Sequence, residues 1–183
     1  MTVETPEGTV LVVEDERELA NLYADYLEDD FDVRVARTGD TALEKLDDVD
    51  AILLDRRLPV VSGNEVLAEL EARDVDARVA LVTAVNPDFD IIDLRIDDYL
   101  VKPVSRAEVR DTVERLLTID EYNNRIQKLT SKALKRNVLA VERTQAELER
   151  SEEFERLTAE VERLEEEVES IAEELGVEDL EYL

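Results

Sequence analysis

Stretches typical of β-strands alternate with stretches typical of α-helices five times before residue 118, and this alternation constrains the fold more than any other feature. The run at 51–54 is wholly apolar, as in a strand that is covered on both faces. Strands that alternate with helices form a doubly wound parallel sheet with right-handed crossovers. We predict this α/β fold, with strands at 10–13, 31–36, 51–54, 78–83 and within 97–104.

Polar residues follow four of these strands. The carboxyl ends of parallel strands share one edge of the sheet, so Glu14, Asp15, Asp55, Thr83 and Lys102 are expected to converge there. Three converging carboxylates repel one another unless a cation intervenes, and Mg²⁺ prefers such oxygen ligands. Lys102 and Thr83 suit the oxygens of a phosphoryl group, which Asp55 could accept by nucleophilic attack. The alternative is an acidic strand terminus in an acidic protein.

At this point the chain resembles the receiver domain of two-component response regulators. The residues that carry the resemblance are ED at 14–15, LLDRRLPVVSG at 53–63, LVTA at 81–84 and DDYLVKP at 97–103. The resemblance implies a receiver domain over 8–118, with a flavodoxin-like sheet in the order 2-1-3-4-5. It also implies a sensor histidine kinase as partner and no enzymatic output beyond self-dephosphorylation.

The resemblance assigns roles to single residues. It makes Asp55 the phosphoacceptor and Tyr99 an aromatic switch that moves with Thr83, although Tyr99 could equally be an ordinary half-buried aromatic. The Arg57 side chain could alter the lifetime of the phosphorylated state or simply be solvated. The remaining implied roles are Mg²⁺ binding by Glu14, Asp15, Asp55 and the main-chain carbonyl of Arg57, phosphoryl contacts from Thr83 and Lys102, and a cis bond before Pro103.

The stretch from Asn86 to Ile96 departs from the expected pattern. A fourth helix should lie here, but Pro87 and scattered acids leave little room for one. We predict a short or irregular element. Many receiver domains dimerise through the face formed by the fourth helix, the fifth strand and the fifth helix, and dimerisation by that face is therefore in doubt.

The remainder, 119–183, is predicted to be a helical domain, with Gly176 as its one helix breaker. The segment 122–141 has five bases and no acid. A basic stripe along one helix face comprises Arg125, Lys128, Lys132 and Lys135. The stripe could contact the phosphate backbone of DNA or lie against the acidic helix that follows.

A seven-residue apolar repeat marks that second helix. Its members are Phe154, Leu157, Val161, Leu164, Val168, Ile171 and Leu175. The repeat suits a two-stranded coiled coil, but a parallel homodimer would face acid with acid at Glu160 and Glu165. Folding back on the basic helix pairs opposite charges instead, with a turn around 149–153.

A receiver followed by an acidic helical region that contains LTSKALKR is similar to the HalX-type response regulators of halophilic archaea. This resemblance implies transcriptional control as the output. The alternative is a phosphorylation-dependent interaction module that dimerises or docks without DNA.

Composition indicates the surroundings in which the chain folds. Acids outnumber bases 49 to 22, for a formal charge of −27. The negative charges repel one another, and concentrated salt screens this repulsion most strongly. Cysteine and histidine are absent, which excludes disulfides, thiolate metal sites and a phosphohistidine on this chain. No stretch reads as a signal peptide or membrane span, so we expect a cytoplasmic protein.

Overall fold

A computed structural model describes residues 8–176. The chain divides between Leu117 and Thr118 into two compact units, which are described separately. The first unit contains β1 (Thr9–Val13), α1 (Arg17–Leu27), β2 (Asp32–Ala36), α2 (Gly39–Glu44), β3 (Ala51–Leu54), α3 (Gly63–Ala72), β4 (Arg78–Thr83), η1 (Phe89–Asp93), β5 (Asp98–Val101) and the beginning of α4 (Arg106–Glu142). The predicted alternation of strands and helices is thereby confirmed.

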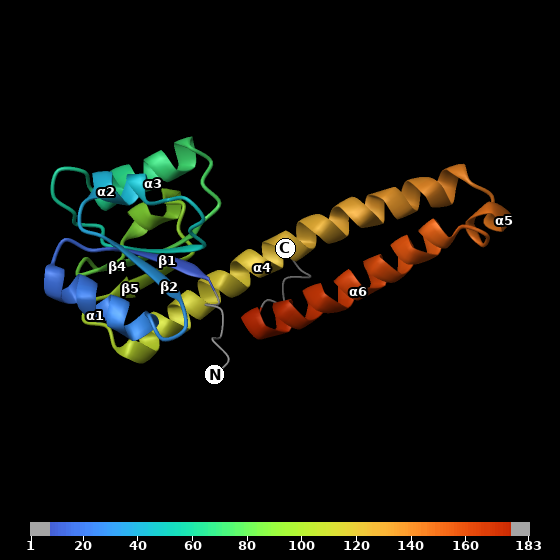
Figure 1. The fold of residues 1–183 in the computed structure, drawn as a ribbon. Coiled ribbons are helices and arrows are strands. Elements are labelled where there is room, and N and C mark those ends of the chain that lie inside the picture. The colour runs from blue at the N-terminus through green and yellow to red at the C-terminus, as the bar shows by residue number, and fades with distance from the viewer. Residues whose placement is uncertain (1–7, 177–183) are drawn as a thin grey trace. The chain divides into compact units, whose positions relative to one another are not determined.

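The five strands form one parallel sheet in the order β2-β1-β3-β4-β5, as predicted. Figure 1 shows α2 and α3 on one side of this sheet and α1 with the beginning of α4 on the other. Successive residues of a strand point to opposite faces, and both faces are buried. In β3, Ile52 and Leu54 join a core cluster with α2 and α3, whereas Ala51 and Leu53 join one with α1 and α4. This two-sided burial is the reason for the uninterrupted apolar run.

Short polar side chains cap α2 and α3, two of the helices that follow the sheet edge. The Ser62 hydroxyl accepts a hydrogen bond from Glu65 N, and the Glu65 side chain reaches back to the Ser62 backbone, which forms a complete capping box before α3. Thr38 caps α2 in a similar way by accepting from Thr41 N. The segment predicted to be short or irregular contains η1, a 3₁₀ helix of 5 residues.

The second unit is a helical hairpin. It consists of the rest of α4, the short α5 (Gln145–Leu148) and α6 (Glu152–Leu175). Thr144 and Ser151 cap the last two helices, so the chain reverses over 143–151, slightly earlier than the predicted 149–153. Gly176 caps the end of α6 and adopts the left-handed conformation (φ 68°) that glycine allows.

The hairpin is antiparallel, with a register set by two ion pairs. Arg125 Nε lies 2.8 Å from Glu167 Oε2, and Lys132 Nζ lies 2.8 Å from Glu160 Oε2. The two bases are seven residues apart (132 − 125) and so are the two acids (167 − 160), in opposite order. Val161 and Leu164, from the predicted apolar repeat, are buried between these pairs.

Within the described residues, no helix is both long enough and apolar enough to cross a membrane.

Candidate functional site

The polar residues predicted to meet at the sheet edge do lie together. Val13 of β1 and Leu81 of β4 both pair in register with Leu54 of β3, so Glu14 and Asp55, one residue further on, and Thr83, two residues further on, come to the same edge of the sheet. Glu14, Asp55 and Thr83 are all buried, at 1%, 6% and 0% exposure. Three buried polar side chains at one edge need partners, because an unpaired buried charge is costly.

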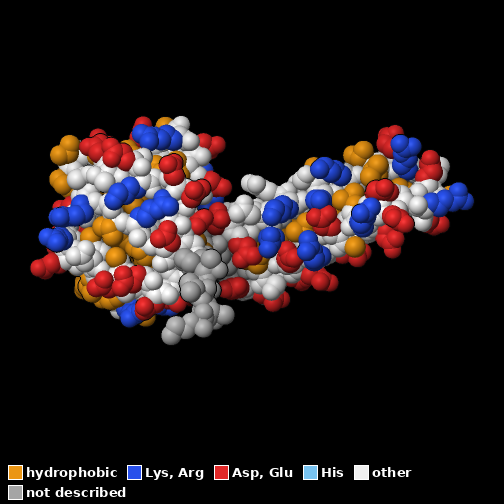
Figure 2. Space-filling model, viewed as in Figure 1, with side chains coloured by type: hydrophobic (Ala, Val, Ile, Leu, Met, Phe, Trp, Pro, Cys, Tyr) orange, Lys and Arg blue, Asp and Glu red, His pale blue; other side chains and the backbone are white. Residues whose placement is uncertain are grey.

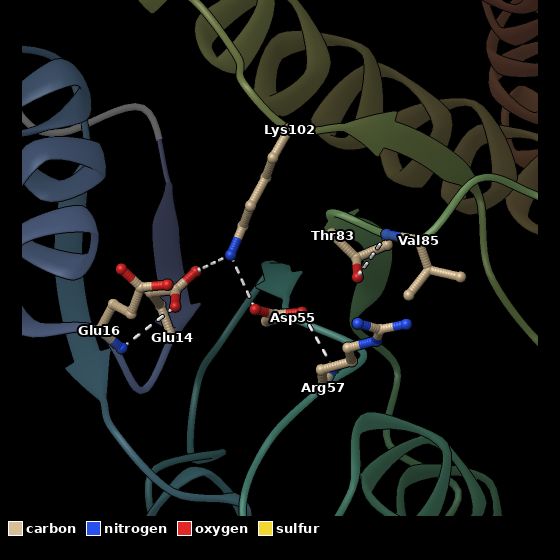
Figure 3. A network of polar contacts seen from close by, with 7 residues as sticks. All are labelled: Glu14, Glu16, Asp55, Arg57, Thr83, Val85 and Lys102. Atoms are coloured by element: carbon tan, nitrogen blue, oxygen red, sulfur yellow. Dashed lines mark hydrogen bonds and ion pairs between the residues drawn. The ribbon is translucent and has the colours of Figure 1, made fainter.

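Lys102, which directly follows β5, supplies the charge that this edge needs. Its Nζ donates to Glu14 Oε2 at 2.5 Å and to Asp55 Oδ2 at 2.7 Å (Figure 3). One ammonium group therefore separates two carboxylates that would otherwise repel. The main chain of Lys102 is anchored at this edge, since Lys102 N donates to Thr83 O at 2.9 Å. The Lys102-Pro103 peptide bond that follows is cis, as predicted.

The titration behaviour follows from this geometry. Burial raises the pKa of Glu14 above its usual value, against the opposing hydrogen bond from Lys102. Burial alone would lower the pKa of Lys102, but the hydrogen bonds to Asp55 and Glu14 outweigh it and raise that pKa. The lysine is thus held in its charged form between the carboxylates.

The pocket also has the ligand set for a divalent cation. Glu14, Asp15 and Asp55 each offer a carboxylate oxygen, and these oxygens lie within 4.8 Å of one another. Hard oxygen ligands of this kind suit Mg²⁺, which commonly uses one or two carboxylates with water and phosphate oxygens. The residues present therefore fit a Mg²⁺ ion. The role of the Arg57 main-chain carbonyl as a further ligand stays a prediction.

Backbone contacts fix the orientation of Asp55. Its N–H donates to Val13 O at 2.9 Å, and its Oδ1 accepts from Arg57 N, also at 2.9 Å. Gly63 packs against the same loop, where an added Cβ would lie 2.5 Å from Asp55 O. With Oδ1 held by Arg57 and Oδ2 by Lys102, the carboxylate has a defined orientation.

Thr83 and Tyr99 lie on the other side of the pocket. The Thr83 hydroxyl accepts from Val85 N at 3.4 Å, and the Arg57 side chain extends toward it in Figure 3. The Tyr99 hydroxyl donates to Val85 O at 2.6 Å, and its ring packs on the core cluster beneath α3. Tyr99 is thereby linked to Thr83 through Val85. This arrangement is compatible with Tyr99 as an aromatic switch and with Tyr99 as an ordinary half-buried aromatic.

One residue near the pocket escaped the sequence reasoning. Arg56 follows Asp55, and its side chain forms an ion pair with Asp90 of η1 and a 3.2 Å hydrogen bond to Asn64 Oδ1. The available signal was a pair of adjacent arginines after Asp55 in a chain that is poor in bases. The long-range partner Asp90 could not be read from spacing.

The basic stripe lies in the second unit and is partly engaged. Arg125 and Lys132 pair with acids of α6, as the interhelix alternative predicts, whereas Lys128 and Lys135 form no ion pair among the described residues. Figure 2 shows bases and acids interspersed along the hairpin. A groove between α4 and α6 is lined by Arg125, Lys128, Lys132, Arg163, Glu160, Glu167 and Leu164.

Comparison with known proteins identifies the class. Residues 10–114 match the family model of the response regulator receiver domain, and residues 118–183 match that of the HalX domain. The chain therefore belongs to the receiver domain family of response regulators and carries a HalX domain after the receiver. The receiver family is one of signalling phosphoacceptors, and its members bind Mg²⁺ at an acidic pocket such as that of Glu14, Asp15 and Asp55.

Individual relatives agree with this placement. A protein from Haloferax volcanii, proposed to be a transcriptional regulator, is 47% identical over 124 residues, which is 67% of this chain but 21% of that protein. Response regulator TrrA from Thermotoga maritima, solved with Mg²⁺ and BeF, is 31% identical, with a TM-score of 0.54 over 60% of this chain and 99% of that one.

A third relative is the receiver domain of a proposed Luxo repressor protein from Vibrio parahaemolyticus. It is 28% identical, with a TM-score of 0.59, and the match covers 64% of this chain and 95% of that chain. These structural matches concern the receiver unit. Because this chain spans about a fifth of the Haloferax relative, the activity of that whole protein does not transfer to it directly.

Proposed function

We propose that this protein is a response regulator that accepts a phosphoryl group on Asp55 from a sensor histidine kinase and controls transcription in response. The observation that supports it most is the Lys102 ammonium, held 2.7 Å from Asp55 Oδ2. The same ammonium contacts Glu14, in a pocket that also offers Asp15 as a ligand. A phosphoacceptor carboxylate needs such a neighbouring cation, because the incoming group is an anion.

The chemistry is a phosphoryl transfer. An Asp55 carboxylate oxygen attacks the phosphorus of the kinase phosphohistidine, the phosphorus–nitrogen bond breaks, and an acyl phosphate forms. Lys102 balances negative charge on the transferring group, and the Thr83 hydroxyl donates to one of its oxygens. Bound Mg²⁺, held by Glu14, Asp15 and Asp55, would supply further charge neutralisation. Attack by water later regenerates the carboxylate, which is the self-dephosphorylation expected of the domain.

Thr83 and Tyr99 would carry the signal away from Asp55. When the Thr83 hydroxyl turns toward the phosphoryl group, it gives up the hydrogen bond from Val85 N. The Val85 carbonyl is the acceptor for the Tyr99 hydroxyl, so this move disturbs Tyr99 as well. We assign Tyr99 the role of the switch on this basis.

Removal of the metal tests the proposal directly. The full chain is incubated with a small phosphodonor such as acetyl phosphate, and phosphoryl uptake is followed by intact mass. With Mg²⁺ present we expect uptake of one phosphoryl group; with a chelator we expect the rate to fall at least about a hundredfold, since charge neutralisation contributes several kcal/mol. Uptake that is equally fast in chelator would contradict the proposed site.

The output is proposed to be transcriptional because a HalX domain follows the receiver and the Haloferax relative is a proposed transcriptional regulator. On this view the protein works in the cytoplasm, and Lys128 and Lys135 of the basic stripe contact DNA phosphates. Lys128 of α4 and Arg163 of α6 both line the groove between the two helices. Phosphate contacts of this kind position a protein on DNA without reading its sequence.

Reversing the charge of Lys128 and Lys135, which form no ion pair among the described residues, tests this output. Lys128→Glu combined with Lys135→Glu should lower chromatin occupancy in the native host about tenfold or more, because attraction to phosphate becomes repulsion. As a matched control, Lys132→Glu with Glu160→Lys exchanges one ion pair while it keeps the net charge and the hairpin. Asp55→Asn should also lower occupancy if phosphorylation gates binding.

A second candidate output is a protein-interaction module, and one observation favours it. The last part of α4 exposes a group of apolar side chains, namely Leu134, Val138, Leu139 and Val141. Such a group is typical of a contact with protein, including a homodimer through the tail. Occupancy that survives the double reversal, together with a mass that rises on phosphorylation in light scattering, would favour this module over DNA binding.

A further inference from the structure

Arg56 has a main chain that cannot move independently of the phosphoacceptor. It is the residue after Asp55, and its carbonyl accepts a hydrogen bond from Gly63 N at 3.0 Å. The first turn of α3 packs closely on this backbone, since a Cβ on Gly63 would lie 2.7 Å from Arg56 Cα. A displacement at Asp55 is therefore passed directly to Arg56.

The Arg56 side chain connects this loop to two other elements. Its Nε donates to Asn64 Oδ1 at 3.2 Å in α3, and its Nη2 forms an ion pair with the Asp90 carboxylate in η1. The Arg56 side chain is 15% exposed, whereas that of Asp90 is 50% exposed. The planar guanidinium suits this arrangement, because it presents several donors in a fixed geometry.

The ion pair with Asp90 also keeps the guanidinium charged, because hydrogen bonding to Asp90 raises the pKa of Arg56 above its usual value. Arg56 is thus linked to the pocket through Asp55 along the chain and to η1 through Asp90 across the fold.

The segment that Arg56 reaches is otherwise lightly held. At its carboxyl end, Leu94 and Ile96 pack on the core, but Phe89 and Ile92 are 85% and 76% exposed. At its amino end, Asp88 caps Phe89 N through its own side chain. Among the described residues, the ion pair between Asp90 and Arg56 is therefore a main long-range contact of η1. A five-residue 3₁₀ helix has little stability of its own.

We propose that Arg56 is a positioning residue that couples the state of Asp55 to the conformation of η1. This inference rests on the proposed function, because it takes Asp55 to be the phosphoacceptor. In the unmodified protein the Arg56–Asp90 pair holds η1 against the loop between β3 and α3. A phosphoryl group on Asp55 displaces the backbone that continues into Arg56, which changes the contacts of Arg56 and thereby releases η1, with its two exposed apolar side chains.

Hydrogen exchange with a phosphoryl mimic tests this coupling in the full chain. Beryllofluoride with Mg²⁺ is added, its binding is followed by fluorine NMR, and amide exchange is measured over 88–97. In the unaltered protein we expect exchange in this segment to speed up about tenfold when the mimic binds. In Arg56→Met and Asp90→Asn, exchange should already be fast without the mimic and change little when it binds.

Three comparisons make the result decisive. Arg73→Met removes an exposed ion pair to Glu69, away from the pocket, and should behave like the unaltered protein. Arg56→Lys keeps the charge but not the fork of donors, so it should be intermediate. If both loss variants bind the mimic and still show the full change in exchange, the inference is overturned. If the unaltered protein binds no beryllofluoride, the proposed function fails first and the inference with it.

Discussion

Asp55→Asn is expected to take up no phosphoryl group, whatever the donor. An amide nitrogen is not a nucleophile at neutral pH, and the amide oxygen lacks the charge needed to attack phosphorus. The change is otherwise small, because the asparagine oxygen can still accept from Arg57 N, as Asp55 Oδ1 does at 2.9 Å. The measurement is phosphoryl uptake by intact mass, with acetyl phosphate and with a histidine kinase.

The matched control for this variant is Asp40→Asn. Asp40 is exposed in the first turn of α2, so its replacement removes one negative charge without touching the pocket. We expect it to take up phosphoryl at the rate of the unaltered chain. Substantial uptake by Asp55→Asn would place the acceptor elsewhere, with Glu14 and Asp15 as the other carboxylates of the cluster to examine.

Lys102→Met should destabilise the protein in the absence of Mg²⁺. The change leaves Glu14 and Asp55 buried close together with no cation between them, and breaking a buried ion pair by removing one partner typically costs about 3 kcal/mol or more. We therefore expect the free energy of unfolding to fall by about 3 kcal/mol. Denaturant unfolding in molar salt measures it.

Magnesium distinguishes this electrostatic cause from simple loss of packing. A divalent cation bound by the same carboxylates would replace the missing positive charge, so Mg²⁺ should recover a large part of the lost stability. Lys45→Met is the control: its Nζ donates to Val35 O at 2.6 Å, and losing that bond should cost about 1 kcal/mol with no response to Mg²⁺. Equal losses in the two variants would argue against the proposed charge balance.

The pocket could be anticipated from the sequence because it follows from topology. Parallel strands bring their carboxyl ends to one edge, so residues that follow apolar runs, such as Asp55 and Lys102, have to converge there. Spacing cannot show which atoms meet. That Lys102 touches Glu14 as well as Asp55 depends on side-chain rotamers that no pattern in the sequence encodes.

Other features lay beyond the sequence for different physical reasons. Asp90 is 34 residues away from Arg56, and an ion pair at that separation depends on the tertiary fold alone. The position of the hairpin turn was predicted slightly too late, because the apolar register was used to place it. Local capping by Thr144 and Ser151 decides where the helices begin.

The ion pairs within the hairpin have a consequence for how it could recognise a polyanion. Each phosphate that a protein neutralises releases a condensed counterion, and the gain from that release shrinks as salt rises. Arg125 and Lys132 are already neutralised by Glu167 and Glu160. With two remaining bases from the stripe, the logarithm of affinity would fall with a slope of only about −2 against the logarithm of salt concentration. A regulator that depends so little on counterion release keeps its affinity in brine, where one built on many free lysines would lose it.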